Sequence, residues 1–145
     1  MRAALPPSRV TWWVLASVGL LAGCRGPSGS PDGSVKAFYS AAAAQDFDAM
    51  TALLSESSLA KLGSQARAHS YFASQFRGWR DFQVDIDDYA IDADGKSATV
   101  RFTCQAEVLD RYKVLKVDCS DVFSLVKQSD GWHIHLPGAQ KLRPL

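Results

Sequence analysis

The chain has 145 residues, 47% of them hydrophobic, with 16 basic and 15 acidic side chains. This length and composition suit one globular domain of ordinary size. The near balance of charge lacks the strongly basic character of nucleic-acid-binding domains, so we expect no nucleic-acid partner.

The N-terminal segment has the features of a secretory signal. Residues 1–10 carry Arg2 and Arg9 and no acidic residue, and residues 12–21 are uncharged and almost wholly apolar. A basic segment followed by a short apolar one and by small residues predicts export and cleavage. The apolar part is shorter than the roughly 20 residues of an ordinary transmembrane helix. The alternatives are an uncleaved anchor and a signal that is cut elsewhere.

The end of this segment resembles the lipobox of bacterial lipoprotein precursors. A Leu-Ala-Gly sequence at residues 21–23 directly precedes Cys24. The resemblance implies that residues 1–23 are removed and that Cys24 receives lipid, such as palmitate, which anchors the chain to the bacterial cell envelope. Because Arg25 follows the cysteine, where Asp commonly retains lipoproteins at the inner membrane, the resemblance favours the outer membrane.

Removal of this signal would leave 122 residues with 14 basic and 15 acidic side chains. Residues 24–33 are rich in Gly, Ser and Pro, which predicts a lipidated cysteine followed by a flexible tether. We expect one domain over residues 34–145. If lipid modifies Cys24, the two cysteines that remain are Cys104 and Cys119, and in an oxidising compartment we expect them to form a disulfide.

Apolar side chains recur at helical spacing between residues 34 and 76. The Ser-Pro-Asp sequence of residues 30–32 suits the start of the first helix, and Asp46 can cap a short second one. The serine-rich residues 55–58 predict a break. A less regular helical region follows, and we expect it to be interrupted at Gly63.

From residue 82 onward the pattern changes from helical to alternating, which predicts strands. The strands are expected over residues 82–86, 100–108, 115–125 and 132–136, and the last two are joined by an Asp-Gly turn. Helices followed by a curved antiparallel sheet of about four strands make an α+β fold.

The second and third strands allow one pairing register to be tested. The hairpin register that places Cys104 opposite Cys119 also places Glu107 opposite Lys116 and keeps the apolar residues on one face. A well-specified register should satisfy the cysteine pair, the charge pair and the apolar face at once, and this register does. Because Arg-Tyr is a poor two-residue turn, we expect a longer loop over residues 110–113.

The order of these elements resembles the nuclear transport factor 2-like superfamily, especially its small lipoproteins without an assigned activity. The matching pieces are residues 34–41 and 45–50, residues 94–100, and residues 123–134. In that superfamily the sheet curls around the helices into a cone whose open end often holds a pocket. Members include isomerases, cyclases, dehydratases and non-catalytic binding or assembly modules, so the fold alone does not decide the function.

Asp121 is the candidate catalytic carboxylate. The hairpin register places it on the apolar face of the sheet, opposite Phe102, where burial would favour its protonated form and suit it to general base catalysis. The resemblance to isomerases of the superfamily implies that Tyr39, on the first helix, stands beside it. The alternative is an Asp121 that is exposed at the rim of the cone.

Three other groups favour structural roles. His133 and His135 share one face of the last strand, and without a visible third ligand we expect exposed histidines, not a metal site. The acidic residues between 85 and 94 lack the closing glutamate of a calcium loop. The aromatic residues between 69 and 79 have the spacing of a helical core. We therefore expect no metal and no cofactor.

These observations favour a membrane-anchored, non-catalytic envelope lipoprotein whose domain binds a small apolar ligand or a protein partner. The first alternative is an isomerase- or dehydratase-type enzyme that uses Asp121 and Tyr39. The second is a structural subunit that forms a homodimer through the outer face of its sheet.

Overall fold

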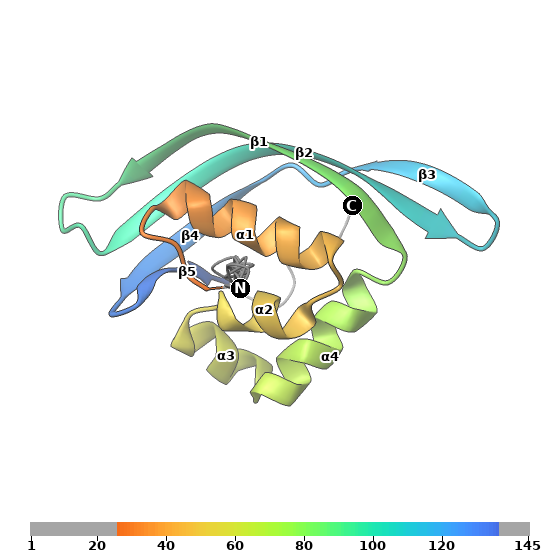
Figure 1. Cartoon of the computed structure of the whole chain (residues 1–145). Coiled ribbons are helices and arrows are strands. Elements are labelled where there is room, and N and C mark those ends of the chain that lie inside the picture. Colours follow the sequence, from red (N-terminus) through yellow and green to blue (C-terminus); the bar gives the residue numbers. More distant parts are fainter. Residues whose placement is uncertain (1–25, 137–145) are drawn as a thin grey trace, which may run out of the picture.

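The computed structural model describes residues 26–136 and contains four helices followed by a curved sheet (Figure 1). The helices are α1 (Pro31–Ala43), α2 (Phe47–Ala52), α3 (Glu56–Leu62) and α4 (Gln65–Gln75). All four lie on the concave side of the sheet. The predicted signal segment and Cys24 lie outside the described residues. Within the part that is described, no helix combines the length and hydropathy needed to cross a bilayer.

Side-chain caps begin three of the helices. The Asp46 carboxylate accepts a hydrogen bond from the backbone N–H of Ala49 at 3.0 Å, as the sequence predicts for α2. Ser55 and Ser64 cap α3 and α4 in the same way. The predicted break over residues 55–58 is therefore only partly correct, because α3 already begins at Glu56. Gly63, whose φ is +101°, ends α3 where a left-handed residue is needed.

The sheet is antiparallel, which confirms the predicted α+β class. Its strands are β1 (Trp79–Ile91), β2 (Ser97–Asp110), β3 (Lys113–Asp118), β4 (Asp121–Gln128) and β5 (Gly131–His135). The order across the sheet is β1-β2-β4-β5, and β3 pairs with the remaining part of β2. The long strand β2 therefore pairs with β4 along its first half and with β3 along its second half.

The predicted register of the hairpin is confirmed. Glu107 pairs with Lys116, and the N–H of Cys119 donates to the carbonyl of Cys104 at 2.9 Å. The expected loop over residues 110–113 is wrong, because Asp110 and Lys113 still pair and only two residues form the turn. The first of these, Arg111, adopts a φ of +54°, a left-handed conformation that such a tight turn requires.

The third predicted strand is divided into β3 and β4 at Ser120. The Ser120 hydroxyl accepts a hydrogen bond from the N–H of Cys104 at 2.9 Å, and the Ser120 N–H donates to the Asp118 carboxylate at 2.9 Å. These side-chain hydrogen bonds replace ladder hydrogen bonds at one position. The pairing resumes in the same register at Asp121, so the break shifts no side chain to the other face.

The core lies between α1 and the concave face of the sheet. Its centre is Phe38, which is fully buried and makes edge-on contacts with Phe72 and Phe123 at 5.6 and 5.8 Å between ring centroids. Such edge-to-face pairs stabilise a core beyond the area that they bury. All the buried residues of the described chain lie between Pro31 and Leu136, so this segment contains the whole core.

The segment before α1 is more ordered than predicted. The expected tether spans residues 24–33, yet α1 begins at Pro31 and Ser28 forms a bridge with Trp132 of β5. The Ser34 hydroxyl accepts from the N–H of Ser28 at 3.0 Å and donates to the carbonyl of Trp132 at 2.7 Å. Residues 28–33 therefore pack on the fold.

Candidate functional site

An open groove of about 320 Å³ runs between helix α1 and the edge strand β1. Its floor is aromatic and aliphatic, its rim carries a hydroxyl and an ammonium group, and its lining residues are Lys36, Tyr39, Ser40, Ala43, Phe82 and Val84. A mostly apolar surface with a few polar groups at one side is typical of small-molecule sites. The groove follows from the inward-facing side chains of β1 and from the face of α1 that packs on them.

Tyr39 is the most buried polar residue of the groove, with 5% of its surface exposed. Its ring contacts Phe102 and Phe123 at centroid distances of 5.4 and 6.2 Å. Burial, and secondarily the negative charge of Asp121, raise the pKa of the Tyr39 hydroxyl well above its usual value. The hydroxyl is therefore neutral at physiological pH, so it can donate a hydrogen bond but is a poor base.

Asp121 lies where the register predicts, opposite Phe102, but it is exposed. Its carboxylate accepts a hydrogen bond from the N–H of Val122 at 2.7 Å. The strand break at Ser120 places Asp121 at the first position of β4, at the rim of the cone. The catalytic hypothesis needs a buried Asp121 beside Tyr39, and the structure gives an exposed carboxylate instead.

The interior of the cone is filled by aromatic rings. Phe102 and Phe123 meet at 4.9 Å between centroids, and Phe76 lies 5.6 Å from Trp79 and 6.1 Å from Phe82. The predicted core role of the aromatic residues between 69 and 79 is thus confirmed for those that are buried. The open space of the groove therefore lies at the edge of this cluster and not at its centre.

The prediction that His133 is exposed is wrong. Its side chain is buried by the segment between α2 and α3, which runs beside β5. Nδ1 donates to the carbonyl of Leu54 at 2.9 Å, and Nε2 lies 2.6 Å from the carboxylate of Asp130. The hydrogen bond from His133 holds the pKa of the Asp130 carboxyl below its usual range.

His135 is half-buried on the same face of β5, and its partners are serines. Its Nδ1 lies 3.3 Å from the hydroxyl of Ser55 and 3.2 Å from that of Ser57. No group of three His, Cys, Asp or Glu side chains among residues 26–136 is arranged to hold a metal ion. The two histidines therefore join β5 to the start of α3.

The acidic residues of β1 and its turn are exposed, as expected for a solvated edge. Asp87 accepts from the hydroxyl of Thr103 at 3.2 Å, and Asp94 accepts from the N–H of Lys96 at 2.8 Å within the turn. Negative charges along an edge strand oppose pairing with another chain. These carboxylates thus have local partners and do not converge on one point.

Cys104 and Cys119 are joined by a disulfide across β2 and the end of β3, with their Cα atoms 4.7 Å apart. Cys104 is fully buried, whereas Cys119 is half-buried at the strand break. The bridge joins two cysteines with a sequence separation of 15 and fixes the hairpin at its base. It follows directly from the confirmed register.

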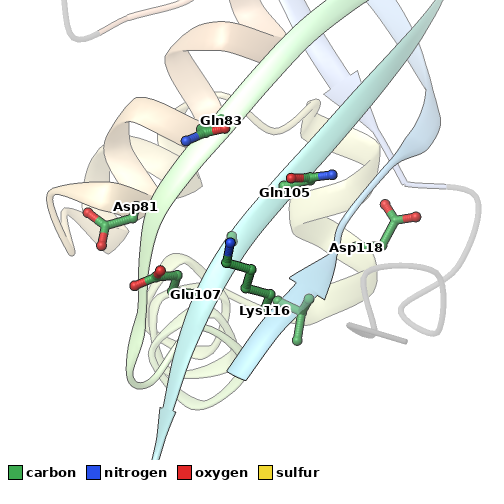
Figure 2. Close-up of a pocket in the computed structure, with 8 residues that line it drawn as sticks. Asp81, Gln83, Gln105, Glu107, Lys116 and Asp118 are labelled. Carbon is green, nitrogen blue, oxygen red and sulfur yellow. The ribbon is translucent and has the colours of Figure 1, made fainter. Parts of the chain in front are cut away.

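A second hollow, of about 290 Å³, lies on the convex face of the sheet. Figure 2 shows polar side chains from three neighbouring strands projecting from this face, and they belong to Asp81, Gln83, Gln105, Glu107, Lys116 and Asp118. Glu107 forms an ion pair with Arg80 at 3.6 Å, and not with Lys116 across the ladder. The sequence analysis predicted only that Glu107 lies opposite Lys116, since the proximity of the other residues depends on the curvature of the sheet.

Comparison with known proteins identifies the fold. The model of the SnoaL-like domain family matches residues 34–136. A ketosteroid isomerase-like protein from Erwinia carotovora superposes with a TM-score of 0.59 and 15% identity, over 72% of this chain and 87% of that one. A SEC-C motif containing protein from Rhodopseudomonas palustris gives 0.57 and 15%, over 76% and 78%. No curated protein sequence matches.

Proposed function

Because this chain belongs to the SnoaL-like domain family, whose fold leaves the activity open, we propose a function from its own groove and its own N-terminus. It is a bacterial envelope lipoprotein, anchored by lipid on Cys24, whose domain is a non-catalytic module that binds a small, largely apolar molecule. The ligand occupies the groove between α1 and β1.

The observation that carries the binding role is the groove itself. Its volume of about 320 Å³ lies at the lower end of the range for small-molecule sites. Phe82 and Val84 supply apolar contact, and Lys36 supplies a positive charge at the rim. Lys36 forms an ion pair with Asp32 at 3.8 Å, and its side chain is 57% exposed. A ligand with an apolar body and a polar or anionic end therefore fits these groups best.

The observation against catalysis is the state of the two candidate residues. Tyr39 is buried and neutral, and Asp121 is exposed to water. A general base works best when its pKa is near the operating pH and when it is positioned against the substrate. The isomerase or dehydratase alternative is therefore not favoured by this geometry.

The groove is tested by blocking it. Ala43→Trp places a large ring in the groove, while Ala44→Trp places the same ring at the exposed C-cap of α1. The chain is purified from its own envelope and examined by native mass spectrometry for a retained molecule. We expect an adduct with the unmodified chain and with Ala44→Trp, and its loss with Ala43→Trp. An adduct that survives in Ala43→Trp would place the ligand elsewhere.

The anchor is tested by labelling cells with a fatty acid. We expect the label to enter the chain and to be lost in Cys24→Ala, with the unmodified chain recovered in the membrane fraction. A chain without label that fractionates with cytosol would contradict the envelope location.

Homodimer formation through the convex face stays a prediction, and the solution mass of the chain from residue 24 onward tests it.

A further inference from the structure

The hairpin formed by the end of β2 and by β3 extends past the helices (Figure 1). Seven large hydrophobic residues in the described chain are exposed, and four of them lie between residues 109 and 115. They are Leu109, Tyr112, Val114 and Leu115, and Tyr112 at the turn is 99% exposed. A cluster of this kind is uncommon on the surface of a water-soluble domain and marks an interaction site.

Both faces of this hairpin tip carry exposed apolar residues. Leu109 pairs with Val114 on the convex face, and Val108 pairs with Leu115 on the concave face. A sheet that packs on one partner usually has one apolar and one polar face. The tip, defined as residues 109–115, instead has exposed apolar side chains on both faces, and on the concave face Leu115 lies next to the charged pair of Asp110 and Lys113.

The charges beside the tip are mostly positive. Arg111 and Lys113 lie in and next to the turn, and the acidic Asp110 is the last residue of β2 and pairs with Lys113. Arg77 precedes Gly78, whose carbonyl accepts from the N–H of Leu109 at 2.9 Å, so it lies at the same level of the hairpin. No ion pair recorded for residues 26–136 uses Arg77, Arg111 or Lys113.

The base of the hairpin carries charges of both signs. Glu107, Asp118 and Asp81 line the hollow on the convex face together with Lys116 (Figure 2), and Arg80 forms an ion pair with Glu107. The hairpin therefore has mixed charge at its base and an apolar tip with an excess of basic groups around it. An anionic lipid surface has the complementary order, because phosphates lie above an apolar layer.

The backbone of the tip is paired along the inside of the hairpin. Residues 105–110 and 113–118 pair without a gap, so the ladder satisfies their facing N–H and C=O groups. Among the described strands β3 pairs only with β2, so its outer edge needs water, and the tip suits the hydrated headgroup region and not the hydrocarbon layer. The disulfide between Cys104 and Cys119 fixes the hairpin at its base.

We propose that the tip of the β2–β3 hairpin is a membrane-binding site for anionic phospholipid. Tyr112 and its apolar neighbours enter the headgroup region, where aromatic side chains are favoured. Arg77, Arg111 and Lys113 bind the lipid phosphates. The site rests on the proposed envelope location and adds to it a second attachment, which orients the domain. A lipid on Cys24 alone would leave the domain free to rotate.

The test uses the chain from residue 24 onward with Cys24→Ser, which contains the whole core but carries no lipid. Sedimentation with vesicles of phosphatidylglycerol and phosphatidylcholine measures binding. We expect binding that weakens with salt and with pure phosphatidylcholine. Tyr112→Ser should weaken it about tenfold. Lys113→Glu changes the charge by two and should weaken it about 25-fold, because each charge near an anionic surface contributes roughly fivefold.

The matched controls lie at the opposite end of the sheet. Tyr89→Ser removes another exposed tyrosine, and Lys96→Glu reverses another exposed lysine. Both should leave vesicle binding within about twofold. Equal losses at Tyr112 and Tyr89, or no binding by the unmodified tip, would overturn the proposal. Tip variants that change only the solution mass would also overturn it, in favour of contact between copies of the chain.

The two proposals fail in different ways. Vesicle binding by the unlipidated chain, without fatty acid labelling in cells, would refute the anchor and keep the hairpin site. Fatty acid labelling in cells, without vesicle binding by the unlipidated chain, would refute the hairpin site and keep the anchor.

Discussion

Strand β2 passes through two environments. Between Ala98 and Ala106 every second side chain is buried beneath the helices. Beyond Val108 the apolar residues no longer alternate with polar ones, and Leu109 of β2 and Leu115 of β3 are 48% and 46% exposed. We call these the covered end and the bare end of the sheet. The comparison shows that an apolar strand can supply either a core or an exposed surface, depending on what packs against it.

The largest expected difference between the two ends is in stability. Phe38→Ala removes the ring at the centre of the covered end, and we expect it to lower the free energy of unfolding by about 3–5 kcal/mol. Tyr112→Ala at the bare end should change it by less than about 0.5 kcal/mol. Urea denaturation followed by circular dichroism measures both. Similar losses for the two variants would erase the distinction between the ends.

The disulfide at the boundary of the two ends should have the next largest effect. Because it closes a loop of separation 15, its reduction should lower stability by about 3 kcal/mol in the chain-entropy model. Denaturation with and without a reductant measures this. Thiol titration of the native chain from residue 25 onward should find no free thiol, whereas two titratable thiols would show that the bridge does not form.

Ser34 tests how firmly the N-terminal segment belongs to the covered end. Its hydroxyl satisfies the N–H of Ser28 and the carbonyl of Trp132. We expect Ser34→Ala to cost about 1–3 kcal/mol, because buried backbone groups lose a partner. Ser40→Ala, on the exposed side of the same helix, is the control and should be near neutral. Equal stability of the two variants would mean that residues 28–33 behave as the predicted tether.

The smallest expected effect is a pH dependence at β5. The hydrogen bond from His133 lowers the pKa of Asp130 below its ordinary value of 3.8. A lowered folded-state pKa gives stability that is present above 3.8 and is lost as the pH falls through the folded value. Denaturation midpoints of Asp130→Asn should therefore fall less on acidification than those of the unmodified chain. Asp110→Asn, at the bare end, is the control, and an identical acid response of both variants would contradict the assignment.

The regular pattern of the sequence was enough to predict the frame of the fold. The pairing of Cys104 with Cys119 and of Glu107 with Lys116 came from one register, because side chains alternate between the faces of a strand. The cap at Asp46 and the break at Gly63 were likewise local chemistry. Such features depend only on residues that are close in sequence or that face each other in one hairpin, so they can be predicted from the sequence.

The candidate site was predicted less well, since burial is a property of the whole fold. Asp121 has the predicted partner in the ladder but is exposed, because the strand break places it at the rim. His133 lies on the predicted face of β5 but is buried, because the segment that includes Leu54 runs beside that strand. The alternation of side chains along the strands was enough to predict which residues share a face and which strands pair. Which of these faces is buried depends on helices and loops that are distant in sequence, because they cover the sheet only in the folded molecule.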